Sequence, residues 1–173
     1  MTKIITLSGK QFCGKDYTAR LLLQSLPSFQ RIGLADAIKL EYSKQTGLSI
    51  EEIEKNKSTY RSDLIDLGNK GRAISPDYWI NNILEKDANI IVPDVRMPHE
   101  VERFKENNAF CIRVQADVET RAKRGTLSRE NDYTETALDN YNNWDFIIDN
   151  SDNANLAEQL DSLILKIKQH FDI

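Results

Sequence analysis

Two glycines and a lysine near the start of the chain constrain its fold more than any other feature. Residues 4–7 are apolar or β-branched, which predicts a short buried strand. Gly9 and Gly14 then bracket four residues, and Lys15 follows at once. This is the G-x-x-x-x-G-K spacing of a loop that curls its backbone N–H groups around a phosphate. The predicted nucleotide-binding residues are Gly9, Lys10, Gln11, Phe12, Cys13, Gly14, Lys15, Asp16 and Tyr17.

The context of this loop agrees with the motif. Residues 17–26 carry three consecutive leucines and predict a helix directly after the loop. A helix that starts near Gly14 adds unpaired N–H groups and its positive dipole end to the same anion. Lys15 is then placed to reach the β- and γ-phosphates. The alternative is a glycine turn between a strand and a helix, with Lys15 in solvent.

Asp16 departs from the pattern, because Ser or Thr is usual after the lysine. A carboxylate at this position keeps an oxygen where Mg²⁺ is expected, and it holds the ion directly or through water. The alternative is that Asp16 only stabilises the helix N-terminus by its negative charge.

Composition narrows the classes of function. The net charge of −4 over 173 residues argues against binding to nucleic-acid polymers, which need a surplus of positive charge. No apolar run approaches the ~20 residues of a membrane helix. The glycine loop begins too early to leave room for a signal peptide, so we expect a cytoplasmic protein. We also expect a monomer or a homodimer. Cys13 and Cys111 are expected to be reduced.

Strand and helix patterns alternate along the chain. Strands are predicted at 4–7, 30–33, 89–92, 110–114 and 144–149, with helices between them and a last helix at 156–170. This predicts a single α/β domain over residues 1–173, with a parallel sheet of about five strands between two helical layers. Ligands of such sheets bind beyond the carboxyl ends of the strands.

A largely helical region is predicted between the second and third strands, at about 36–85. Leu64, Ile65 and Leu67 are expected to face its core, and Ser75 and Pro76 are expected to start a helix at 77–85.

Asp94 and Arg96 follow the apolar strand 89–92. An acid at the end of such a strand is where phosphoryl-transfer enzymes orient Mg²⁺ or its waters. The alternative for Asp94 is an ordinary turn at the strand end. Arg96 either holds an acceptor phosphate with its two-pronged guanidinium or pairs on the surface with Glu100.

Other charged residues are candidates for acceptor binding. Lys39, Arg61 and Arg72 lie on the helices between strands two and three, where they would neutralise a phosphorylated acceptor or remain solvated. Asp36 follows the second strand and either accepts from the acceptor or caps a helix.

A basic, polar stretch follows the fourth strand. Arg121, Arg124 and Arg129 surround it, which predicts a lid at about 121–134 that closes over ATP and stabilises charge on the transferred group. The alternative is an exposed charged helix.

In this order the segments resemble P-loop kinases of the nucleoside-monophosphate-kinase group. The resemblance spans residues 4 to about 156 and is carried by segments 8–16, 34–39, 67–72, 76–79, 93–100, 135–139 and 145–150. Within the group the chain is similar to phage-type deoxynucleoside monophosphate kinases and to animal-type phosphomevalonate kinases. It implies a three-layer P-loop kinase fold with a helical acceptor region and a short lid.

The resemblance also implies roles for single residues. Lys15 would contact the ATP phosphates, Asp16 and Asp94 would serve Mg²⁺, and Arg124 would belong to the lid. The implied ligands of the acceptor phosphate are Arg72 and Arg96.

The two relatives differ in their acceptor. Phosphomevalonate kinases carry extra basic residues where Gln11 and Phe12 stand, and often a second arginine where Met97 stands. We therefore expect ATP-dependent transfer to a (deoxy)nucleoside monophosphate, with phosphomevalonate as the alternative acceptor. The unusual Asp16 leaves a third possibility, a nucleotide-binding module without catalysis.

Overall fold

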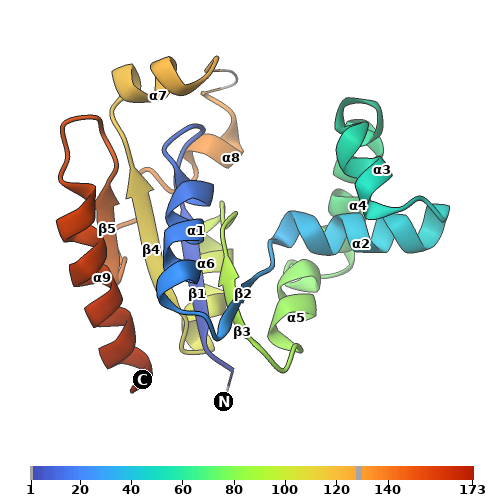
Figure 1. Cartoon of the computed structure of the whole chain (residues 1–173). Helices are drawn as coiled ribbons and strands as arrows, with labels where there is room; N and C mark the ends of the chain where they lie inside the picture. The colour runs from blue at the N-terminus through green and yellow to red at the C-terminus, as the bar shows by residue number, and fades with distance from the viewer. Residues whose placement is uncertain (1, 128–129) are drawn as a thin grey trace. The chain divides into compact units, whose positions relative to one another are not determined.

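The computed structural model describes residues 2–127 and 130–173, and the chain divides into two compact units (Figure 1). The sheet unit comprises the chain up to Arg31 together with Ala88–Ile173. The helical unit comprises Ile32–Asp87. Each unit is described by itself below.

All strands of the sheet unit run parallel, as the alternating pattern predicted. The strand order in the five-stranded sheet is β2-β3-β1-β4-β5. Thr6 lies opposite Val92 on one neighbour of β1, and Ser8 lies opposite Arg113 on the other. The loops after β1 and β3 therefore leave the sheet side by side. The strands are β1 (Ile4–Ser8), β2 (Phe29–Arg31), β3 (Asn89–Val92), β4 (Phe110–Gln115) and β5 (Phe146–Asp149).

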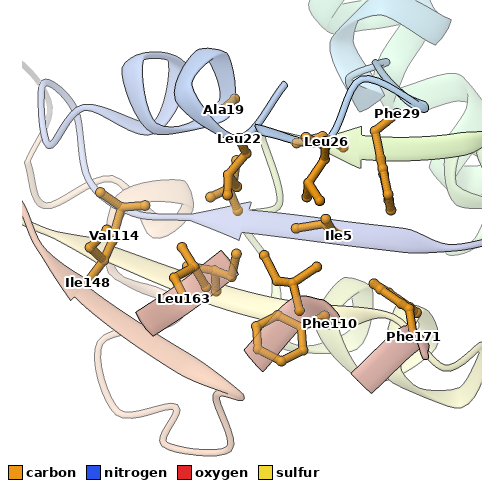
Figure 2. Packing of buried hydrophobic residues seen from close by; sticks show 14 of the residues in the cluster. Ile5, Ala19, Leu22, Leu26, Phe29, Phe110, Val114, Ile148, Leu163 and Phe171 are labelled. Carbon is orange, nitrogen blue, oxygen red and sulfur yellow. The ribbon is translucent and has the colours of Figure 1, made fainter. Parts of the chain in front are cut away.

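Helices cover both faces of this sheet, which confirms the predicted three-layer fold. Figure 2 shows Leu22 and Leu163 packed over Ile5, Val114 and Ile148 in the core on one face. These two leucines belong to the first and last helices of the unit, and a third helix covers the opposite face (Figure 1). The helices are α1 (Lys15–Ser25), α6 (Pro98–Glu106), α7 (Val118–Arg124), α8 (Tyr133–Thr136) and α9 (Leu156–Phe171).

The helical unit is built around Trp79. Its indole Nε1 donates to the carbonyl of Gly68 over 2.9 Å, and its ring fills the space where a Cβ on Gly71 would sit, 2.6 Å away. The missing side chain of Gly71 thus lets a buried ring lie directly on the α4 backbone. The helices are α2 (Leu34–Thr46), α3 (Ile50–Lys55), α4 (Lys57–Ile74) and α5 (Tyr78–Leu84).

Two expectations for the helical unit are wrong. Ile65 does not face the core, because its exposed fraction is 48%. Ser75 does not begin a helix: it ends α4, and its hydroxyl and carbonyl accept from Asp77 and Tyr78 in a turn that leads to α5. Asp77 is the N-cap instead.

In the described part of the chain, no helix combines the length and the apolar character that crossing a bilayer requires.

Candidate active site

The glycine loop has the strand-loop-helix context that its spacing predicted. Gly9 and Gly14 have φ of 157° and 96°, which side chains rarely adopt. A Cβ on Gly9 would lie 2.3 Å from the carbonyl oxygen of Val114, and one on Gly14 would lie 2.1 Å from the amide nitrogen of Asn150. Gly14 is also the N-cap of α1. Both positions therefore require glycine for conformation and for space.

Lys15 lies over this loop, half-buried. Its Nζ donates to the carbonyls of Gly9 (2.6 Å) and Lys10 (3.0 Å). Burial lowers the pKa of the Lys15 ammonium below its ordinary value, and the positive charge of Arg96 lowers it further. Nearby Cys13, Glu135 and Asp16 oppose this shift of the Lys15 pKa. The structure thus disagrees with a solvated Lys15 and places a second cation beside it.

That second cation, Arg96, comes from the loop after β3. The backbone N–H of Val95 donates to the carbonyl of Leu7 (3.3 Å), so this loop is tied to the end of β1. Glu100 does not pair with the Arg96 guanidinium; its carboxylate accepts from the backbone N–H of Arg96 (2.8 Å) instead. The guanidinium donates to Glu135 over 2.5 Å. The surface ion pair weighed from the sequence is therefore replaced by a pair with a buried carboxylate.

Glu135 connects two parts of the site. It lies in α8, and only 5% of its side chain is exposed. One carboxylate oxygen accepts from Arg96, and the other accepts from the backbone N–H of Gln11 in the glycine loop (2.9 Å). Sequence reasoning missed this role, because Glu135 entered only as part of the 135–139 segment in the family resemblance.

Asp139, in the same segment, forms a second link to the loop. It pairs with Lys10 over 2.8 Å and with Arg113 over 3.4 Å. Arg113 is buried beneath the loop and donates to the hydroxyl of Ser8 (3.1 Å). A charged residue inside β4, an otherwise apolar strand, was the available sequence signal for this contact.

One of the predicted lid arginines contacts the glycine loop, and another contacts the segment after β5. Arg121 is buried, donates to the carbonyl of Gln11 (3.4 Å) and pairs with Glu130 (2.7 Å). Arg124 donates to the carbonyl of Asn150 (2.7 Å). Arg121 is therefore not solvated, whereas Arg124 and most of α7 are exposed, so the lid stays a prediction. Arg129 lies outside the described residues.

Asn150 closes the opposite side of the loop. Its side-chain amide donates to the carbonyl of Cys13 over 2.9 Å. A hollow of about 580 Å³ opens nearby, with Cys13, Arg121 and Ser151 in its lining. The site therefore combines a backbone anion loop, several cations and a space next to them.

Two exposed aromatic residues lie in the loop and on the helix that follows it. Phe12 has φ of 59°, and its ring occupies the space beside Gly125, where a Cβ would lie 2.4 Å from a ring carbon. Tyr17 lies on α1 with the guanidinium of Arg20 5.7 Å from its ring centre. Both residues stay predictions as nucleotide contacts.

The two predicted metal ligands have different surroundings. The Asp16 carboxylate is 78% exposed and pairs with Arg31 over 3.2 Å, whereas Asp94 is half-buried after β3. Residues 2–127 and 130–173 contain no group of three or more potential metal ligands. Single carboxylates fit Mg²⁺ that arrives on a phosphate chain, because this ion keeps waters and phosphate oxygens as most of its ligands.

The remaining candidates belong to the helical unit. Asp36 accepts from the N–H of Gly33 (2.8 Å), so it caps α2 as the alternative proposed. Lys39 is buried and pairs with Asp36 and Glu54. Burial pushes the pKa of Lys39 down, but the hydrogen bond to Glu54 and the charge of Asp36 outweigh it, so the pKa is raised. Arg61 and Arg72 are exposed on α4.

Solved structures support the fold. Shikimate kinase from Aquifex aeolicus superposes with a TM-score of 0.55 at 18% identity, covering 98% of each chain. Shikimate kinase from Bacteroides thetaiotaomicron gives a TM-score of 0.52 at 13% identity over 99% of each chain. At these identities the likeness establishes the three-layer P-loop kinase fold.

Sequence relatives go further. The model of the phosphomevalonate kinase family matches residues 7–110, which include the glycine loop, Asp94 and Arg96. Phosphomevalonate kinase from Drosophila melanogaster is 30% identical over an aligned length of 139 residues, and the match covers 72% of this chain and 74% of the relative.

These matches confirm the predicted enzyme class, an ATP-dependent phosphotransferase with a phosphate group as acceptor. They support the phosphomevalonate alternative better than the (deoxy)nucleoside monophosphate that the loop sequence favoured, and they speak against a module without catalysis. The chain belongs to the phosphomevalonate kinase family.

Proposed function

We propose that the protein transfers the γ-phosphoryl group of MgATP to the phosphate of phosphomevalonate. The observation that carries this proposal is the family match over residues 7–110, which spans both the nucleotide loop and the arginine beside it. The geometry agrees, because Lys15 contacts the glycine loop directly and Arg96 is linked to the same loop through Glu135.

The reaction needs alignment and charge rather than a covalent intermediate. An oxygen of the acceptor phosphate attacks the γ-phosphorus, and the bond from that phosphorus to the β–γ bridging oxygen breaks, so that ADP leaves. No general base is required, because the attacking oxygen is already ionised. The loop N–H groups and Lys15 would hold the triphosphate, while Arg121 and Arg124 would stabilise charge on the transferred group.

Mg²⁺ would be held by Asp16 and Asp94, directly or through waters. When bound, the ion would neutralise negative charge on the phosphates. Asp16 would have to exchange its contact with Arg31 for this role.

On the acceptor side, Arg96 would bind the phosphate of the acceptor. Arg72, Arg61, Lys39 and Asp36 of the helical unit are the further proposed contacts. Of these, Arg61 and Arg72 are exposed, whereas Lys39 and Asp36 are already engaged with partners in their own unit.

A second candidate acceptor is a (deoxy)nucleoside monophosphate. It is favoured by the loop itself, where an amide at Gln11 and an aromatic ring at Phe12 stand in place of basic residues. Phe12 packs at Gly125 and offers no charge to a second phosphate.

An acceptor panel tests the proposal. The protein is incubated with MgATP and, in separate reactions, phosphomevalonate, each common deoxynucleoside monophosphate and no acceptor, and ADP release is followed. We expect release that depends on phosphomevalonate, with a phosphorylated product visible by ³¹P NMR. Release that depends on a deoxynucleoside monophosphate alone would replace the proposed acceptor with the second candidate.

A further inference from the structure

The carboxylate of Glu135 contacts two protein groups, the Arg96 guanidinium and the Gln11 backbone N–H, that lie in segments proposed to serve different substrates. We propose that Glu135 is a positioning residue, which holds Arg96 and the glycine loop in one geometry before the substrates bind. The inference rests on the proposed role of Arg96 at the acceptor phosphate.

The two oxygens of this carboxylate have separate partners. One accepts from the Arg96 guanidinium at 2.5 Å, and the other accepts from the Gln11 N–H at 2.9 Å. Both are charge-assisted bonds, which are shorter and stronger than bonds between neutral groups. A rotation of the side chain that improved one bond would therefore break the other, so the pair of contacts fixes a distance between loop and guanidinium.

Burial makes this link stiff. The Glu135 side chain is 5% exposed, whereas the acid of the Arg103–Glu106 pair on α6 is 64% exposed. A buried carboxylate that loses its partners leaves an uncompensated charge, which is strongly destabilising. An exposed pair contributes little, because water replaces the partner.

The segment that carries Glu135 is itself anchored on both sides. Asp132 caps α8 by accepting from the N–H of Thr134 (2.9 Å). After the helix, Asp139 pairs with Lys10 of the loop (2.8 Å). Glu135 therefore projects from a turn that is attached to the glycine loop at a second point.

The charges near Glu135 are a further reason to assign it a positioning role. The positive charge of Arg96 lowers the pKa of Lys15, and the negative charge of Glu135 raises it. Two neighbouring cations repel each other while no substrate anion lies at the site. The Glu135 carboxylate offsets that repulsion and holds Arg96 through the ion pair.

The first test is the replacement Glu135→Gln. Glutamine retains the size and an acceptor oxygen for Gln11, but it removes the charge that holds Arg96. We expect kcat/KM for phosphomevalonate to fall about 10- to 100-fold, as for other small misplacements of a catalytic geometry. KM for ATP should change less than about threefold, since the loop contact remains. Glu135→Asp, which keeps the charge on a shorter side chain, should recover part of the loss.

Glu106→Gln is the matched control, because it removes the same charge from an exposed Arg–Glu pair of the sheet unit. It should leave both kinetic constants unchanged. Thermal unfolding and calorimetric ATP binding of every variant show whether the fold and the loop persist. If Glu135→Gln does not fold, Glu135→Asp takes its place in all comparisons.

A double-mutant cycle with Arg96→Ala separates the two levels of the proposal. We expect Glu135→Gln to cost less than about twofold once Arg96 is absent, because its effect passes through Arg96. An equal loss in both backgrounds would overturn the positioning role and leave the role of Arg96 intact. An unchanged acceptor KM and kcat in Arg96→Ala alone would overturn the proposed role of Arg96 at the acceptor.

Discussion

The candidate-site arginines of the two units are held in opposite ways. In the sheet unit Arg96, Arg113 and Arg121 each pair with a carboxylate, and two of them are buried. In the helical unit Arg61 and Arg72 are exposed on α4, and the buried cation Lys39 is neutralised by two acids. Positive charge is thus fixed around the glycine loop and left adjustable on α4.

This difference predicts different contributions of the two sets of side chains to catalysis and to binding. Fixed charges stabilise a transition state without rearrangement at the moment of reaction. Exposed side chains each lose about 0.5–1.5 kcal/mol of rotamer freedom when a ligand orders them. We therefore expect substitutions near the loop to reduce turnover strongly and substitutions on α4 to act mainly on acceptor binding.

The largest effect is expected for Lys15→Ala. The variant loses the charge that we propose meets the ATP phosphates, so kcat/KM should fall by about 10³-fold or more. Circular dichroism and the unfolding midpoint should stay near those of the wild type, because the half-buried ammonium contributes little to packing. Turnover close to the wild-type rate would contradict the expectation that substitutions near the loop reduce turnover more than substitutions on α4.

Gly71→Ala tests the packing of the helical unit. The new Cβ would lie 2.6 Å from the Trp79 ring, an overlap that should lower the free energy of unfolding by about 3 kcal/mol. Gly47→Ala is the control, since Gly47 has φ of 76° with open space around it and should cost only about 1 kcal/mol of strain. Urea unfolding measures both. Equal losses for the two variants would contradict the Trp79 packing.

A third prediction concerns the pH dependence of the sheet unit. Burial raises the pKa of the Cys111 thiol to about 11. The unfolded chain releases this proton at lower pH than the folded chain, so the contribution of Cys111 is complete below the unfolded pKa. It is lost as pH rises through the folded pKa, and the loss is about 2–3 kcal/mol.

Urea unfolding at pH 8 and at pH 10.5 measures this loss. Cys111→Ala should show a smaller decrease between the two pH values than the wild type. An identical decrease in both proteins would show that the Cys111 thiol does not titrate as the structure indicates.

The smallest effect is expected for Arg72→Ala. Losing one exposed cation of the proposed acceptor region should raise KM for phosphomevalonate about tenfold, or about 1.4 kcal/mol, with KM for ATP unchanged. Lys70→Ala on the same helix is the control and should change neither constant. A lower kcat with unchanged acceptor KM would mean that Arg72 acts in the chemical step, as fixed cations do.

Local features of the site could be predicted from the sequence, and long-range ones could not. The glycine loop is defined by residues that are neighbours in the chain, so its spacing predicted the strand, the turn and α1. Glu135 contacts Gln11 and Arg96, which are 124 and 39 residues away, and nothing near Glu135 reveals those partners. The same holds for Asn150 and Cys13, which are 137 residues apart.

The wrong expectations have local causes. Ser75 and Pro76 form a good helix start by residue type, yet α4 runs to Ile74 and uses Ser75 at its own end. Gly71 is a poor helix former by residue type, but the buried Trp79 ring requires glycine within α4. Propensity is overridden in both cases by the packing of a neighbouring helix.

Because the partners of the glycine loop are distant in the chain, the loop lacks their support early in synthesis. The motif at residues 9–15 leaves the ribosome first, but Glu135, Asp139 and Asn150 support it only after most of the chain has followed. A nascent chain or a proteolytic fragment that ends after β4 carries the entire signature of a nucleotide site without the supports of its loop. We therefore expect the ability to bind a triphosphate to form late in translation, although the residues of the motif are synthesised first.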